Sequence, residues 1–197
     1  MNDHELAEHN FRSQIERNSY PGRGLVVGRS SDEEAWLLVY FIMGRSQHSR
    51  NRRFAVDGSV LRTEPVDLGR VEDPSLIIYE AMLEGDATYL VSNGDQTRTI
   101  RDELARGGSF EAALATRERE PDAPNYTPRI SAIVDLRNQG ASVSLSILKA
   151  NPLDPEQTDR TTFSPGEPRA GFGWMLTTYQ GDGDPLPSFV GDPLSVP

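Results

Sequence analysis

Two glycine-arginine-serine segments follow two apolar runs near the start of the chain. Leu25-Val26-Val27 precedes Gly28-Arg29-Ser30, and the run from Ala35 to Met43 precedes Gly44-Arg45-Ser46. Guanidinium groups, hydroxyls and backbone N–H groups at strand ends can surround an anion. The pattern therefore indicates the phosphate-binding half of a nucleotide site. Two turns with solvated arginines would give the same pattern, because arginine is mostly exposed in proteins.

Four further positions could carry chemistry, and each also has a simpler structural explanation. Asn93 closes a strand-like run before a helix, whose N-terminus attracts anions, but the same residues are ordinary turn and cap residues. Arg129 follows a loop with three prolines, which would hold its guanidinium in a fixed position, or it simply ends a turn. Tyr79 lies in an apolar run, as core tyrosines do. Glu120 has the setting of an ordinary surface carboxylate.

The residue types argue against several kinds of catalysis. No two of His4, His9 and His48 have a metal-ligand spacing, so we expect no metal site. His48 lies in the arginine-rich segment, as a solvated side chain or as an acid or base. Cysteine is absent, which excludes a thiol nucleophile, a disulfide and a thiolate metal site. Lys149 is the only lysine, which argues against Schiff-base chemistry. No cofactor fingerprint is visible, so we expect no cofactor.

Composition and charge narrow the class of protein. The chain has 197 residues, of which 36% are hydrophobic and 25% charged, which fits one globular domain. The net charge of −10 argues against nucleic acid as a partner, because phosphate binding needs a basic surface. No apolar run reaches about 18 residues, so we expect no membrane span. No signal peptide is visible at the N-terminus, so we expect a cytoplasmic protein.

The elements that must position these residues are mostly short strands. A helix is predicted over 3–18 and two more over 96–105 and 110–119. The run from Ala35 to Met43 is almost wholly apolar, which predicts a strand buried on both faces. Asp57-Gly58 is a strong hairpin signal, and the segment 75–83 is predicted as a strand whose first part could be helical. The tail from Gly181 is rich in Gly, Asp and Pro, so we expect it on the surface or docked on a neighbour. Hairpins with segregated helices argue for an α+β fold.

Six segments, in this order, resemble the archaeal-type IMP cyclohydrolase family and its bacterial relatives. They are Tyr20-Pro21-Gly22-Arg23-Gly24, Gly28-Arg29-Ser30, Tyr40-Phe41-Ile42-Met43-Gly44-Arg45-Ser46, Ser49-Arg50-Asn51-Arg52, Val91-Ser92-Asn93-Gly94 and Asn125-Tyr126-Thr127-Pro128-Arg129-Ile130. Thr178-Tyr179 and Pro185-Leu186-Pro187-Ser188-Phe189 look like the bacterial branch. The resemblance covers about residues 20 to 192, and the set is more specific than any one of its segments.

This resemblance implies a fold, a reaction and a domain division. The fold is a four-layer α/β/β/α sandwich of two antiparallel sheets, as in N-terminal-nucleophile hydrolases. The reaction closes 5-formamidoimidazole-4-carboxamide ribonucleotide to inosine monophosphate with loss of water, the last step of purine biosynthesis. We expect a helical extension over 1–19, the cyclohydrolase-like domain over 20–180 and a tail over 181–197. Relatives and the tail suggest a homo-oligomer.

The resemblance also implies roles for single residues in this reaction. The carboxamide nitrogen must attack the formyl carbon, so the site must align both arms, stabilise an oxyanion and move protons. Arg52 matches a position that would stabilise the oxyanion, and Tyr79 one that would relay a proton. Glu120 would orient or deprotonate the carboxamide, although Glu118 competes for this assignment.

Five polar residues are candidates for binding phosphate, ribose or base. They are Arg23, Arg29, Asn51, Asn93 and Arg129. One departure concerns Thr177, where the bacterial branch would have a histidine before Thr-Tyr, so substrate binding would be altered if that histidine contacts the substrate. Two other functions stay open: a purine-nucleotide-binding module without turnover, and an amide hydrolase with a terminal nucleophile. The second requires an N-terminal Cys, Ser or Thr, whereas Met1 is followed here by Asn2.

Overall fold

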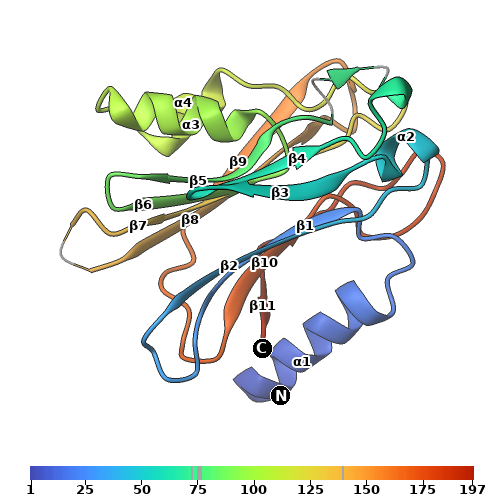
Figure 1. The fold of residues 1–197 in the computed structure, drawn as a ribbon. Helices are drawn as coiled ribbons and strands as arrows, with labels where there is room; N and C mark the ends of the chain where they lie inside the picture. Colours follow the sequence, from blue (N-terminus) through green and yellow to red (C-terminus); the bar gives the residue numbers. More distant parts are fainter. Residues whose placement is uncertain (72, 75–76, 139) are drawn as a thin grey trace.

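Two antiparallel sheets form the centre of the computed structural model, which describes residues 1–71, 73–74, 77–138 and 140–197 (Figure 1). The smaller sheet has the strand order β11-β10-β1-β2. Its strands are β1 (Arg23–Arg29), β2 (Trp36–Ile42), β10 (Gly173–Thr177) and β11 (Leu194–Val196). The larger sheet places seven strands in sequence order: β3 (Arg53–Asp57), β4 (Val60–Glu64), β5 (Glu80–Gly85), β6 (Thr88–Ser92), β7 (Arg129–Asp135), β8 (Ser142–Ala150) and β9 (Thr158–Phe163).

Helices cover the two outer faces of this sandwich (Figure 1). Helices α3 (Gln96–Ala105) and α4 (Phe110–Ala115) lie on the larger sheet, and α1 (Asp3–Phe11) lies on the smaller one. A π-helical segment, Arg12–Glu16, continues α1, while α2 (Gln47–Arg50) and a 3₁₀ turn at Leu68–Arg70 lie in connections. The layer order is thus α/β/β/α, which confirms the predicted α+β sandwich.

Two apolar clusters hold the layers together. The main cluster lies between the sheets and includes Leu25, Ile130 and Val134, all fully buried. The second lies beneath α3 and α4 and includes Ile100 and Ile133. Successive side chains of a strand point to opposite faces, so β7 sends Ile130 and Val134 inward and Ile133 toward the helices. Because helices and a second sheet cover its two faces, β7 is buried on both.

Strand β2 does not have the burial that its sequence predicted. The prediction of a strand buried on both faces is wrong, because Leu37 and Val39 are each 48% exposed. They alternate with Leu38 and Tyr40, which face the main cluster. β2 is an edge strand, and α1 does not lie over it. Its outer face therefore meets solvent although it is apolar.

The C-terminal segment is part of the smaller sheet. β11 pairs with β10 in antiparallel register, and Leu186 and Phe189 are buried. Most of the segment lies at the surface as expected, with only Leu186, Phe189 and Val196 buried, and its docking on a neighbour stays a prediction. Its Gly and Pro content obscured a strand of only three residues.

The predicted helices have the expected starts; α3 also ends as predicted, and the other two end earlier. Ser109 caps α4, and the helix ends at Ala115 instead of residue 119. The first helix ends at residue 16 instead of 18, and its N-cap is Asn2. Part of the predicted 75–83 strand, residues 75 and 76, lies outside the described residues, and β5 begins at Glu80.

Candidate active site

Two adjoining cavities of about 180 and 200 Å³ lie at one end of the sandwich, where β1 begins and β2 ends. Most of the lining comes from four segments, around residues 20–23, 43–52, 120–127 and 178–179, and Asp73, Ile77 and Leu186 complete it. Both cavities are lined by the same five polar side chains: Arg23, Ser46, Ser49, Arg52 and Asp122. Loops and the short helix α2 supply most of these residues, and Arg23 is the first residue of β1. Two sheets thus form a rigid scaffold for a polar site built mainly from their connections.

A buried ion pair between Arg23 and Glu120 forms part of the wall. Arg23 is 9% exposed and Glu120 is 3% exposed. Both guanidinium Nη atoms contact the carboxylate, with Nη2 3.3 Å from Oε2, and Nη1 also donates to the Asn93 carbonyl at 3.3 Å. Burial alone would lower the pKa of Arg23, but attraction to Glu120 outweighs it and raises the pKa well above its usual value. Arg23 therefore stays charged and holds the Glu120 carboxylate in place.

A pair of buried tyrosines lies close to this ion pair. The hydroxyls of Tyr40 on β2 and Tyr79 are 2.7 Å apart, so one donates to the other. Burial, and then Tyr79, raise the pKa of Tyr40 well above its usual value, although Arg23 and Arg52 act in the opposite direction. The Tyr40 hydroxyl is therefore neutral near pH 7. Such a pair can donate a hydrogen bond or relay a proton.

The second glycine-arginine-serine segment forms the opposite wall. Ser46 and Ser49 cap the start of α2 reciprocally, with each hydroxyl accepting from the other's backbone N–H at 3.0 Å. Arg52 lines both cavities and donates from Nε to the Ser49 carbonyl at 3.0 Å. A Cβ at Gly44 would meet the Ser49 carbonyl carbon at 2.7 Å, so this tight turn requires glycine. Arg45 lines the first cavity and bonds Asp182 at 2.8 Å.

The first glycine-arginine-serine segment lies at the other end of β1. Six residues of strand separate Arg29 from Arg23, which corresponds to about 20 Å. Arg29 donates to the Glu33 carbonyl, stacks on the Trp36 ring at 5.0 Å and lies 3.7 Å from Glu167. The structure therefore does not bring Arg29 together with the cavity residues.

The two predicted asparagines support the walls. Asn51 exchanges two hydrogen bonds with the backbone of Asp67, at 2.7 and 2.8 Å. Asn93 donates to the Pro128 carbonyl at 2.8 Å and accepts from the Ile130 N–H at 2.8 Å. Both side-chain amides are thus bonded to neighbouring loops, and neither lines the two cavities.

Arg129 lies on the outer face of the larger sheet, because its neighbour Ile130 points inward. Its Nη1 donates to Asp95 at 2.6 Å and to Gln96 at 2.7 Å, which fixes the start of α3. Burial would raise the pKa of Asp95, but Arg129 and Arg117 outweigh burial and lower it. Arg129 is thus separated from the cavities by the sheet.

The structure distinguishes the two competing glutamates. Glu118 has an exposed side chain that binds Arg160 at 2.7 Å and Thr158 at 2.5 Å on the surface. Glu120, two residues later, turns inward, lines the second cavity and pairs with Arg23. Only Glu120 therefore reaches the candidate site.

Four polar residues that line the first cavity had no predicted role: Asp122, Thr127, Thr178 and Tyr179. Asp122 accepts from the Thr127 N–H at 2.6 Å and from its hydroxyl at 2.5 Å, and that hydroxyl is 2.7 Å from the Tyr179 hydroxyl. Thr178 lines the same cavity. The segments Thr127-Pro128 and Thr178-Tyr179 contributed to the family resemblance, which was the available signal.

Thr177, the position of the expected histidine, points away from the cavities. Its hydroxyl accepts from the Gln14 Nε2 at 2.6 Å and lies beneath the N-terminal helix. Adjacent side chains of a strand point to opposite faces, so Thr178 reaches the cavity and Thr177 does not. A threonine in place of the expected histidine at position 177 therefore affects a contact with the N-terminal helix and not the lining of the cavities.

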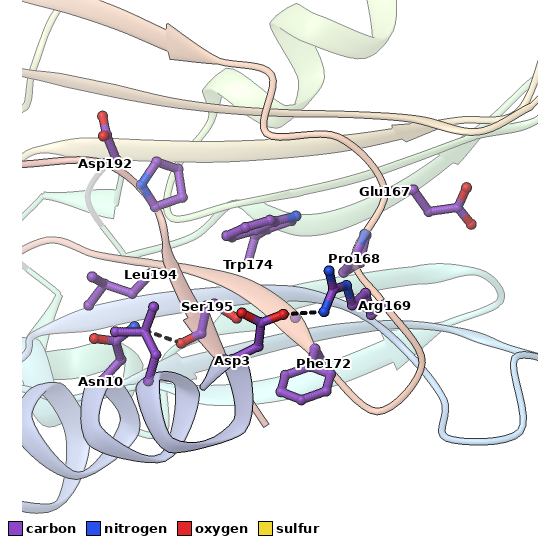
Figure 2. A pocket seen from close by; sticks show the side chains of 13 residues that line it. Asp3, Asn10, Glu167, Pro168, Arg169, Phe172, Trp174, Asp192, Leu194 and Ser195 are labelled. Atoms are coloured by element: carbon purple, nitrogen blue, oxygen red, sulfur yellow. Dashed lines mark hydrogen bonds and ion pairs between the residues drawn. The ribbon is translucent and has the colours of Figure 1, made fainter. Parts of the chain in front are cut away.

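A larger hollow of about 560 Å³ lies beside α1 and the end of β11. Figure 2 shows Trp174 at its centre, with Asp3 paired to Arg169 and Asn10 donating to the Ser195 carbonyl at 2.9 Å. Its walls are mainly apolar, and none of the eight candidate site residues lines it. The two smaller cavities are therefore the candidate active site.

In 1–71, 73–74, 77–138 and 140–197, no three His, Cys, Asp or Glu side chains are placed to share a metal ion. Over the same ranges, no helix has the length and apolar content needed to cross a membrane.

Comparisons with known proteins agree on one family. A family model described as IMP cyclohydrolase-like protein matches residues 20–192, which include all residues lining the two cavities. The IMP cyclohydrolase of Methanocaldococcus jannaschii is 31% identical over 117 residues. That alignment covers 59% of this chain and 57% of the relative, so it spans little more than half of each protein.

Proposed function

Because the chain belongs to the family of IMP cyclohydrolase-like proteins, we propose that it closes 5-formamidoimidazole-4-carboxamide ribonucleotide to inosine monophosphate. In this reaction the carboxamide nitrogen bonds to the formyl carbon, the formyl oxygen becomes a hydroxyl, and that hydroxyl leaves as water. The reaction would complete purine biosynthesis, and we propose the cytoplasm as its compartment. The name of the Methanocaldococcus jannaschii relative supports the same activity.

One observation supports the proposal: a fixed carboxylate and two guanidinium groups line two small cavities, and a buried pair of tyrosine hydroxyls lies close to the Arg23–Glu120 ion pair. Glu120 is held by Arg23, the Tyr40–Tyr79 pair lies close to Arg23, and Arg52 lines both cavities. The reaction needs an acceptor for the amide proton, a donor to the departing oxygen and stabilisation of negative charge. The candidate site offers one group for each of these tasks.

We assign Glu120 to the carboxamide arm. Arg23 orients its two oxygens, and the remaining lone pairs can accept the N–H of the attacking amide. Amide nitrogens are weak nucleophiles, so holding both arms in contact is a large part of the rate enhancement. Arg23 has a positioning role here, since its guanidinium already bonds Glu120 and the Asn93 carbonyl.

We assign Arg52 and Tyr79 to the formyl arm. The guanidinium of Arg52 stabilises negative charge on the formyl oxygen as the ring closes. Tyr79, through its hydrogen bond with Tyr40, passes a proton toward that oxygen before it leaves as water. Both tyrosines are buried, which keeps bulk water from competing.

We assign the phosphate to the α2 side of the first cavity. Arg45, Ser46 and Ser49 line it, and guanidinium and hydroxyl groups are suitable phosphate donors. Taken together, the two cavities, of about 180 and 200 Å³, lie at the lower end of the roughly 300–1,000 Å³ typical of ligand sites. The phosphate would lie on one side of Arg52 and the two arms of the imidazole on the other, so the substrate would occupy both cavities.

The test is to incubate the purified protein with the formylated carboxamide ribonucleotide and follow inosine monophosphate by ultraviolet absorbance. The proposal predicts clear acceleration over the uncatalysed closure. No acceleration, with inosine monophosphate still raising the melting temperature, would favour a binding module without turnover. Loss of the N-terminal residues in an intact-mass measurement would favour an amide hydrolase instead.

A further inference from the structure

The hollow of about 560 Å³ beside α1 has the size of a ligand site, although the proposed ring closure does not use it. Ligand pockets typically have volumes of about 300–1,000 Å³. The hollow is larger than the two cavities of the candidate active site taken together. Leu6, Phe172 and Leu194 contribute to its apolar walls, and Trp174 lies at its centre (Figure 2). We call it the Trp174 hollow.

Three contacts fix the walls of the Trp174 hollow. On the helix side, Asn10 of α1 donates to a carbonyl of β11 at 2.9 Å, and Asp3 pairs with Arg169 in the loop before β10. At the centre, the indole N–H of Trp174 donates to the Gly166 carbonyl at 3.0 Å. Since the N–H is the only polar group of the indole, the side chain offers a ligand the faces of its ring.

Two walls of the hollow lie outside the part of the chain that matches the family model. The match covers residues 20–192, whereas α1 (Asp3–Phe11) and β11 (Leu194–Val196) lie before and after it. Both elements contribute side chains to the lining. The Trp174 hollow therefore depends on elements that the family match does not include, which favours a ligand other than the nucleotide.

The charges of the lining favour a cation over an anion. Carboxylates of Asp3, Glu167 and Asp192 line the hollow, against the guanidinium of Arg169. Figure 2 shows Glu167 and Asp192 on opposite sides of the Trp174 ring. The net charge of −10 for the whole chain acts in the same direction, because it attracts cations and repels anions.

The partners of these carboxylates strengthen this preference. Asp3 is paired with Arg169, and Glu167 lies 3.7 Å from Arg29 with 46% of its side chain exposed. Within the described part of the chain, Asp192 forms no ion pair. An entering cation thus meets an uncompensated carboxylate, whereas an anion meets a guanidinium that already has a counter-ion.

We propose that the Trp174 hollow binds a small organic cation, whose alkylated ammonium group lies on the indole ring and whose apolar body lies against the walls. The face of an indole ring is negative, and tryptophan is the best aromatic partner for cations. Apolar walls keep water from the contact, which strengthens the attraction. A metal ion fits less well, because it needs several oxygen ligands, and no three carboxylate or histidine side chains among the described residues are placed to share one.

Trp174 can report the binding itself, because the chain has only two tryptophans. In Trp36→Phe, Trp174 is the one that remains, and its fluorescence can be titrated with acetylcholine as a probe. The control ligand is 3,3-dimethylbutyl acetate, in which an uncharged carbon replaces the ammonium nitrogen. Acetylcholine should give a saturable change in emission and bind at least about 10-fold more tightly than the neutral ester. Equal affinities, or no saturable change with acetylcholine, would overturn the proposal.

Two aspartates that each precede a proline allow a matched test of the charge. Asp192→Asn, in the same Trp36→Phe background, should weaken acetylcholine binding at least about 3-fold and leave binding of the neutral ester unchanged. Asp184→Asn is the control, because Asp184 is also exposed and does not line the hollow. Equal effects of the two variants on acetylcholine binding would contradict the proposal.

Trp174→Leu tests the ring, since leucine keeps an apolar side chain against the main cluster but has no π face. Binding is then followed by ligand-detected NMR, and the preference for acetylcholine over the neutral ester should fall below about 3-fold. Arg52→Gln, at the candidate active site, should leave this preference unchanged. A preference that survives Trp174→Leu, or that disappears in Arg52→Gln, would place the cation elsewhere and refute the proposal. If Trp174→Leu does not fold, the pair of aspartate variants still decides the question.

Discussion

Replacing Glu120 by glutamine should destabilise the fold more than any other conservative change of a carboxylate discussed above. The variant keeps the shape of the side chain but leaves Arg23 charged, 9% exposed and without a counter-ion. Removing one partner of a buried ion pair costs about 3–5 kcal/mol, because the remaining charge is still out of water. For a domain of this size, each kcal/mol lowers the melting temperature by about 2–4 °C, so we expect a drop of about 6–20 °C.

Glu118→Gln is the matched control for this experiment. Glu118 has a 60% exposed side chain and pairs with Arg160 on the surface, so its loss should cost about 0–1 kcal/mol. The assay is thermal and urea unfolding followed by circular dichroism, with both variants and wild type in the same buffer. The double variant Arg23→Leu/Glu120→Leu should regain most of the lost stability, since no buried charge remains.

Two results would refute this reasoning. If the free energies of unfolding of Glu120→Gln and Glu118→Gln differ by less than about 1 kcal/mol, the Glu120 carboxylate does not compensate the charge of Arg23 in the folded protein. If the double leucine variant is less stable than Glu120→Gln, the loss comes from packing and not from an uncompensated charge.

Three further predictions separate the cavity from its surroundings. Arg45→Ala should raise the KM at least 10-fold with little change in kcat, whereas Arg29→Ala, at the far end of β1, should leave the KM within about 3-fold in the same steady-state assay. Thr178→Val should change the KM, while Thr177→Val should instead lower the free energy of unfolding by about 1–2 kcal/mol, because the buried Gln14 amide loses a partner. Asp95→Asn should cost no more than about 1 kcal/mol at pH 7, since Asp95 is half exposed. The pKa of Asp95 is lowered in the folded protein, so its ionised form stabilises the fold fully above the unfolded pKa of about 3.9. In urea titrations the difference from wild type should therefore shrink below that pH and vanish once pH has fallen through the lower folded pKa.

Local signals in the sequence located most of the elements. The Asp57-Gly58 turn joins β3 and β4 as expected, and Ser109 caps α4. Local signals could not predict that the outer face of β2 is exposed, because this depends on which strands the N-terminal helix covers. β11 was missed because three residues carry almost no periodic signal, and its partner strand precedes it by about twenty residues.

The candidate site was harder to predict because its members are distant in sequence. Arg23 and Glu120 are 97 residues apart, and nothing in either segment shows that they pair. Family resemblance supplied Arg52, Tyr79 and Glu120; Arg52 and Glu120 line the cavities, and Tyr79 lies behind them, close to Arg23. Arg29 and Arg129 lie away from these residues, Arg29 at the far end of β1 and Arg129 on the outer face of the larger sheet. A sequence motif shows neither the length of a strand nor the face on which a side chain lies. Tyr40 was missed because a tyrosine in an apolar run looks like any core residue.

Arg52 lines both cavities, and we propose that it acts in ring closure there. The most direct measurement is the rate of inosine monophosphate formation at saturating formylated ribonucleotide for wild type, Arg52→Gln and Arg53→Gln. Arg53 is the matched control, because its side chain is 66% exposed and pairs with Glu64 on β4. We predict that Arg52→Gln lowers kcat at least about 10²-fold with an unchanged melting temperature, as expected for loss of one oxyanion donor, and that Arg53→Gln does not. Equal rates for all three proteins, or a loss of rate that only follows unfolding, would contradict the claim.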